Sequence, residues 1–303
     1  LKYVLKRILS ALVTIFFYHH DHILSDESDP RQPFAAEKMP NPEIEAAMRQ
    51  VTGLGQPLSE QYIIYLGNFL RGDFGVSYTK AGLTVNKVIA DGFPFSLTIG
   101  IYASLVVVFA GILFGSVCAL RQNKLIDRFF MVLSTLGSTI PSFVLATGFL
   151  FPFSKTLGLV PAFGVDEVAG YIGPVLVIGA FPLSFITRLT RTSLVEVQQQ
   201  DYIRTARSKG ISEFKVIYKH ALRNALLPVV TYIGPWWPPL SPAPLSLDVF
   251  GIPGVGQLFT DSIVNRDYPL IMGITVFFAV LLVLAVLIVD LVYVLIDPRI
   301  KLD

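Results

Sequence analysis

The sequence predicts an all-α polytopic membrane protein with about six transmembrane helices, and two observations support this fold class. Hydrophobic residues make up 53% of the 303 residues and charged residues only 15%, which gives a mean hydropathy of +0.61. A soluble protein of this size carries about 25% charged residues. The Lys and Arg residues are also unevenly distributed along the chain, as they are in membrane proteins whose loops alternate between the two sides.

A membrane span needs about 20 mostly apolar residues. Four stretches meet this requirement clearly: Phe95 to Leu120, Phe129 to Leu157, Ile172 to Leu189, and Leu270 to Ile296. A first transmembrane segment is expected over residues 1–23, although its apolar run from Ile8 to Tyr18 is short. A fifth span starts near Leu226 and meets a proline cluster at 235–244, which predicts a kinked or interrupted helix.

The distribution of charge predicts the topology. Lys and Arg favour the cytoplasmic side of a membrane. With a cytoplasmic N-terminus, most of the 24 Lys and Arg residues fall in cytoplasmic segments and most of the 22 acidic residues fall outside. This pattern requires an even number of spans, so both termini are predicted to be cytoplasmic. The chain then divides into an extracytoplasmic cap region, residues 24–94, and a transmembrane domain, residues 95–303, which contains a long cytoplasmic loop at 190–225.

The long cytoplasmic loop has a helical pattern on each side of a glycine. Apolar residues recur at Ile203 and Ala206, and again at Ile211, Phe214 and Ile217 after Gly210. Ser212 followed by Glu213 suits the start of a second helix. The sequence therefore predicts a helix, a glycine turn and a helix at the inner membrane surface. Periodicity leaves two interpretations open: an amphipathic segment resting on anionic lipid, or a docking element for a cytoplasmic partner.

Sites with their own chemistry are not expected on this chain. Gly251, Gly254 and Gly256 lack the Gly-Lys-Ser/Thr ending of a phosphate-binding loop and predict a rigid turn instead. In the HHDH run at 19–22, only two of the His side chains would share a helix face, so no metal site is predicted. Asp290, an ionisable residue in the last span, is a functional candidate by position, but a structural hydrogen bond is the favoured interpretation. No catalytic triad, cofactor site or nucleic-acid partner is predicted.

Several segments resemble one family of transport proteins. DYIRTARSKG at 201–210 and KHALRNALLPVVTYIGP at 219–235 resemble the EAA loop of bacterial ABC-importer permeases, in the variant usual among oligopeptide and dipeptide permeases. Placing Gly210 on the family glycine puts Arg204, Thr205 and Ala206 on the Glu-Ala-Ala positions, of which only Ala206 matches. Further agreement with the first permease subunit, in its Gram-positive-like form, comes from GLGQPLSEQYIIYL, GDFG, FGIPGVGQ, NRDYPLIMG and VDLVYVLIDPRIK. Residues 18–29 and 236–249 depart from the family pattern.

The resemblance implies a type I ABC importer permease fold, and a channel subunit of an oligopeptide or dipeptide importer in the bacterial plasma membrane. It implies two cytoplasmic ATPase subunits that bind ATP and Mg, a paralogous second permease subunit and an extracellular peptide-binding protein. The residues expected to couple this chain to the ATPase subunits are Arg204, Thr205, Ala206, Arg207, Gly210, Ile211, Phe214 and His220. Nickel or glutathione import is the alternative within the family. A secondary transporter, which needs ion ligands in mid-membrane, is the alternative from another class.

Overall fold

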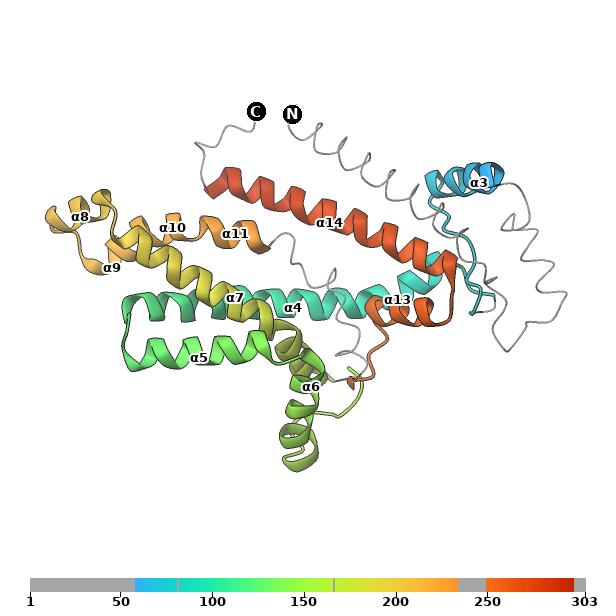
Figure 1. Ribbon diagram of the computed structural model, residues 1–303, viewed down its shortest axis with the longest axis horizontal. Helices are drawn as coiled ribbons and strands as arrows, with labels where there is room; N and C mark the ends of the chain where they lie inside the picture. Colours follow the sequence, from blue (N-terminus) through green and yellow to red (C-terminus); the bar gives the residue numbers. More distant parts are fainter. Residues whose placement is uncertain (1–57, 81, 166, 234–248, 297–303) are drawn as a thin grey trace. The chain divides into compact units, whose positions relative to one another are not determined.

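A computed structural model of the protein describes residues 58–80, 82–165, 167–233 and 249–296 (Figure 1). The described residues are nearly all helical and contain no strand, apart from an isolated antiparallel bridge between Val76 and Thr84. This confirms the predicted all-α class. The first predicted transmembrane segment, the HHDH run and the family departure at 18–29 lie outside the described residues, as does the departure at 236–249 except for its last residue.

Three described helical segments are long and apolar enough to cross a membrane: Val85–Leu120, Val168–Gln198 and Tyr268–Ile288. The predicted spans at Phe95 and Ile172 are therefore present, but the first begins ten residues earlier and the second continues to Gln198. A broken helix pair provides a fourth candidate if its two parts form one span. The described residues thus confirm a polytopic membrane protein.

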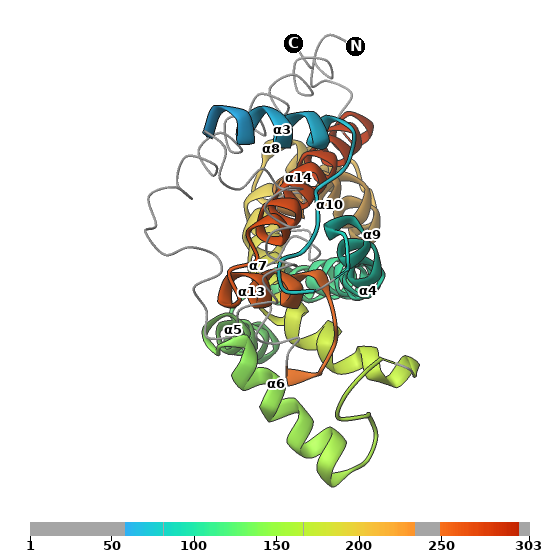
Figure 2. The same ribbon diagram turned by 90° about the vertical axis from the view of Figure 1, so that its right-hand side faces the viewer.

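The predicted span from Phe129 to Leu157 is not one straight helix in the structure. Helix α5 (Leu125–Thr139) ends before Ile140, and α6 begins at Ser142, so that the two parts are bent by 109° (Figure 2). Ile140 has extended backbone angles, φ −76° and ψ 127°. The ring of Pro141 disfavours a helical conformation of the preceding residue, so the Ile140–Pro141 step breaks the helix.

The structure divides into two compact units, of which the first comprises Leu1–Phe95 and Pro253–Val283. Its described helical parts are α3 (Leu58–Leu70), the start of α4 (Val85–Leu120), α13 (Val255–Val264) and the start of α14 (Tyr268–Ile296). Its core consists of buried aliphatic side chains from α4, α13 and α14: Val85, Val88, Ile89, Val255, Leu258, Leu270 and Ile274. Gly92 allows the close approach of α13, since a Cβ at this position would lie 2.6 Å from Leu258 Cδ1.

The second unit comprises Ser96–Ile252 and Leu284–Asp303. Its described elements are the remainder of α4 and α14, α5, α6 (Ser142–Leu150), a π-helical segment (Phe151–Thr156), a 3-10 turn (Val168–Tyr171), α7 (Ile172–Gln198), α8 (Asp201–Ser208), α9 (Glu213–Lys215), a second π-helical segment (Val216–Ala221), α10 (Leu222–Ala225) and α11 (Leu227–Ile233).

Helix α7 packs against both α4 and α5 in this second unit (Figure 1). A Cβ at Gly115 of α4 would lie 2.6 Å from Thr190 Cβ, and a Cβ at Gly137 of α5 would lie 2.5 Å from Ser184 Oγ. The two glycines therefore let α4 and α5 approach α7 more closely than any larger residue would permit. Because protein interiors are close-packed, contacts of this kind resist displacement of one helix past the next.

Candidate coupling site

The loop at 190–225 folds as predicted into a helix, a glycine turn and a second helical segment. Helix α8 ends at Ser208, and the Gly210 N–H donates a hydrogen bond of 2.9 Å to the Arg207 carbonyl oxygen. Gly210 has φ +73°, and an added Cβ would meet no atom within 4 Å. Glycine is therefore required here by its left-handed backbone conformation, which costs other residues energy, and not by crowding.

A buried cluster anchors the loop to two long helices. Ile203 and Ala206 of α8 lie in one hydrophobic cluster with Leu194 of α7 and Ala119 of α4. The segment after the glycine turn adds three buried aliphatic residues to this cluster: Val216, Ala221 and Ala225. Helix α8 is therefore in direct packing contact with the ends of α4 and α7. We refer to this set of seven residues as the anchoring cluster.

An ion pair braces the glycine turn. Arg207 Nη2 lies 2.7 Å from Glu213 Oε1, and Arg207 Nε donates to Glu213 Oε2 at 3.1 Å. The hydrogen bonds from Arg207 lower the pKa of Glu213, and those to Glu213 raise the pKa of Arg207. Both side chains are partly solvent-exposed, at 40% and 57%, so the pair contributes little stability, and it links α8 to α9 across the glycine turn.

The predicted coupling residues divide into an outer and an inner set. Arg204, Thr205, Arg207, Gly210 and Phe214 are exposed. Ala206 is buried and Ile211 and His220 are half-buried, and of these three Ala206 and Ile211 pack in or against the anchoring cluster.

Exposed aromatic side chains complete the outer surface of the loop. Phe214, expected on the apolar face from its spacing, is instead 69% exposed, and its ring lies 4.4 Å from the ring of Tyr218. Sequence reasoning missed Tyr218 and Tyr202, which are 51% and 43% exposed. The signal that could have identified Tyr202 and Tyr218 is their spacing, because the helical period places both aromatic rings on the solvent-facing side of the loop. Exposed aromatics are typical of protein–protein contact surfaces.

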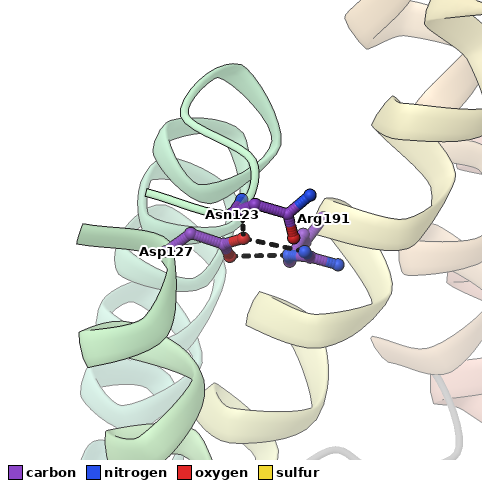
Figure 3. Close-up of polar contacts among 3 residues, drawn as sticks. All are labelled: Asn123, Asp127 and Arg191. Carbon is purple, nitrogen blue, oxygen red and sulfur yellow. Dashed lines mark hydrogen bonds and ion pairs between the residues drawn. The ribbon is translucent and has the colours of Figure 1, made fainter. Parts of the chain in front are cut away.

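The sequence also gave no indication of a buried ion pair beside the anchoring cluster. Arg191 of α7 contacts Asp127 in the first turn of α5, with Nε–Oδ1 at 2.7 Å and Nη2–Oδ2 at 2.8 Å (Figure 3). The Asn123 N–H donates a further hydrogen bond of 2.8 Å to Asp127. The Asp127 side chain is only 3% exposed. This bidentate pair joins α5 to α7, three residues before Leu194 of the anchoring cluster.

The remaining sequence candidates acquire no chemical role from the structure. Gly251 has φ +62° in a turn, Gly254 precedes α13, and Gly256 lies inside that helix, so these glycines form a helix entry and no phosphate loop. Asp290 lies within α14, and its side chain is outside the described residues. Among the described residues, no group of three or more His, Cys, Asp or Glu side chains could hold a metal ion.

Comparison with known proteins identifies the family. Residues 111–302 match the family described as "Binding-protein-dependent transport system inner membrane component". The chain is 40% identical over 302 residues to the dipeptide transport system permease protein DppB of Bacillus subtilis, covering 99% of this chain and 98% of that protein.

Two further relatives are oligopeptide transport system permease proteins. The chain is 39% identical to OppB of Haemophilus influenzae and 35% identical to OppB of Escherichia coli strain K12, with 99% of each chain covered in both comparisons. Together with its apolar helices, the family match identifies a multi-pass protein of the bacterial plasma membrane. The chain belongs to the family of binding-protein-dependent transport system inner membrane components, the permease components of ABC transporters.

Proposed function

We propose that this chain is a transmembrane channel subunit of an ABC importer for dipeptides or oligopeptides, and that it couples ATP hydrolysis by partner subunits to alternating access. The observation that carries the proposal is the braced helix–turn–helix at residues 201–221. It presents Phe214 and Tyr218 outward while its apolar side is packed on α4 and α7. The names of relatives that align along nearly the whole chain support peptides as the substrate class.

In this proposal the energy arrives by mechanical contact. The sequence has no phosphate-binding loop, so ATP and Mg are bound by two cytoplasmic ATPase subunits that dock on the outer surface of the loop. When the ATPase subunits close, α8 moves with them, and the anchoring cluster passes the displacement to α4 and α7. The Arg191–Asp127 pair extends the displacement to α5.

The remaining parts of the importer follow from the same proposal. A paralogous second permease subunit completes the pore, and an extracellular binding protein delivers the peptide to the outer face, where the cap region at 24–94 receives it. Both termini and the 190–225 loop face the cytoplasm, in agreement with the distribution of Lys and Arg.

The test is uptake into proteoliposomes that contain the whole importer. Labelled dipeptide and a labelled oligopeptide should accumulate only when ATP, both ATPase subunits and the binding protein are present. Nickel and glutathione, offered in parallel, should not accumulate. Accumulation of either one in place of peptide would reassign the substrate. Uptake driven by an ion gradient, with no ATPase subunit present, would instead show a secondary transporter and contradict the proposal.

A further inference from the structure

The turn between α4 and α5 combines two adjacent surface hollows of opposite character. One is an apolar groove of about 510 Å³ between the helices, lined by side chains from α4 (Leu113, Phe114, Val117) and from α5 (Ile126, Phe129, Phe130). The other, of about 550 Å³, is lined by three cations, Arg121, Lys124 and Arg128. Leu125 and Ile126 line both hollows, so the apolar groove and the cationic hollow form one continuous surface.

The floor of the apolar groove is built from packed aromatic rings. Phe114 of α4 and Phe130 of α5 are stacked with their centroids 4.6 Å apart, and Phe129 lies edge-on to Phe130 at 5.5 Å. Above this floor, Leu125 is 82% exposed and Phe129 is 64% exposed. Exposed apolar side chains therefore lie next to three cations. This combination suits an amphipathic ligand, with one apolar part and one anionic part.

The cationic hollow keeps its full positive charge. Arg121, Lys124 and Arg128 are exposed and form no ion pair within the described part of the chain. The acidic residue among them, Asp127, is turned into the structure, where Arg191 neutralises its carboxylate. Three unpaired cations therefore face outward beside the groove and favour an anionic group there.

The position of this surface at the end of an apolar helix favours a lipid as the bound molecule. The cations lie in the turn where α4 ends at Leu120 and α5 begins at Leu125, at the polar end of a helix that is apolar enough to cross a membrane. Basic pockets between transmembrane helices at this level bind anionic lipid headgroups. We propose that the hollow formed by Arg121, Lys124 and Arg128, together with the groove above Phe114 and Phe130, is a binding site for one anionic phospholipid. The phosphate contacts the cations and an acyl chain fills the groove.

The proposal is tested by native mass spectrometry of the purified importer, titrated with dioleoyl phosphatidylglycerol or with dioleoyl phosphatidylcholine. The variant Arg121→Gln/Lys124→Gln/Arg128→Gln should bind phosphatidylglycerol roughly 100-fold more weakly than the wild type, since each of the three cations independently strengthens binding of an anionic headgroup by roughly fivefold. Phosphatidylcholine binding should not change. The matched control Lys209→Gln/Lys215→Gln/Lys219→Gln removes the same charge from exposed positions on the 190–225 loop, and should keep wild-type binding of phosphatidylglycerol.

The single variant Arg128→Gln keeps the test decisive if the triple variant does not fold, and it should give a smaller loss that Arg128→Lys restores. Equal losses in the triple variant and in its control would show general surface attraction and overturn the site. Unchanged phosphatidylglycerol binding together with loss of the second permease subunit from the complex would identify the groove as a protein interface, which also overturns it.

Discussion

The guanidinium group of Arg191 holds both carboxylate oxygens of Asp127 at 2.7 and 2.8 Å, across 64 residues of sequence. Leu194, on the same helix, lies in the anchoring cluster that packs the 190–225 loop against α4 and α7. One helix therefore bears both the packing contact to the loop and the ionic contact to α5. This arrangement connects the loop by direct contacts to α4, α5 and α7.

We expect Asp127→Ala to lower the free energy of unfolding by about 3 kcal/mol, because it leaves the half-buried Arg191 charge unpaired. The double variant Asp127→Ala/Arg191→Ala should lose less than the sum of the two single variants. Unfolding in mixed detergent–SDS micelles provides the measurement. Lys87→Ala serves as the control, because it breaks the exposed Lys87–Asp91 pair and should cost less than about 1 kcal/mol. Strict additivity of the two losses would show that the two charges do not stabilise each other.

The positive φ of Gly210 predicts that substitutions at this position weaken ATPase docking to different degrees. Gly210→Asn should retain most ATPase docking, because Asn tolerates φ +73°, whereas Gly210→Val should weaken docking roughly 5- to 30-fold from a backbone cost of about 1–2 kcal/mol. The measurement is the affinity of the detergent-purified permease pair for its ATPase subunits. Gly67→Val, in the helical backbone of α3 with equally open space around it, should have no effect on docking. Equal loss with Asn and Val would contradict an origin in backbone strain.

The Arg207–Glu213 pair predicts a charge-swap rescue. Arg207→Glu places two like charges across the glycine turn and should lower ATP-driven uptake several-fold without preventing membrane insertion. The swapped pair Arg207→Glu/Glu213→Arg should restore a substantial part of the uptake, because it rebuilds the brace with reversed polarity. If the swapped pair remains inactive while the loop is folded, Arg207 acts by contacting the ATPase subunit directly.

The same pair predicts a dependence on pH with a definite sign. The pKa of Glu213 is lowered in the folded loop by the hydrogen bonds from Arg207. Its contribution to stability is therefore present above the unfolded pKa of about 4.3 and is lost as pH falls through the lower folded value. At pH 7, Glu213→Gln should make the 201–221 segment more sensitive to a protease, by an amount corresponding to less than about 1 kcal/mol. This difference from the wild type should shrink as the pH is lowered below 4. A difference that grew on acidification would contradict the assignment.

A buried carboxylate in the first unit predicts a local effect. Asp267 is fully buried and accepts hydrogen bonds from the hydroxyls of Ser77 and Thr79 and from the backbone N–H groups of Tyr78 and Thr79. Asp267→Asn replaces one acceptor oxygen by a donor and should speed amide hydrogen exchange of Tyr78 and Thr79 about 10- to 100-fold. Asp261→Asn, at an exposed position on α13, is the matched control. Unchanged exchange in Asp267→Asn would mean that residues 77–79 are held by other contacts.

The sequence predicted what depends on local pattern. Apolar length located the spans in α4, α7 and α14, and the glycine between two helical periods located the turn at Gly210, because both are properties of short contiguous stretches. The break at Ile140–Pro141 was missed although Pro141 is visible, because a hydropathy window measures how apolar a stretch is and not the direction of its backbone.

Pairings between distant residues were beyond prediction from one sequence. Arg191 and Asp127 are separated by 64 residues, and nothing in the sequence around either one indicates that they meet. Asp267 and Thr79 are separated by 188 residues, and only the folded core of the first unit brings them together. The exposure of Phe214 was mispredicted for a related reason. The helix widens into a π-helical segment from Val216, so the apolar period of an α-helix does not continue across that boundary.

The most direct test of the account is the reactivity of a single introduced thiol. Cys118 is buried and is the one cysteine of the sequence, whereas Phe214 is 69% exposed, so Phe214→Cys provides a thiol at the tip of the loop over a low background. The account predicts that a membrane-impermeant maleimide labels this thiol in inside-out vesicles and not in right-side-out vesicles, and that assembly with the ATPase subunits blocks the reaction. Labelling from the outer side, or unchanged labelling in the assembled importer, would contradict it.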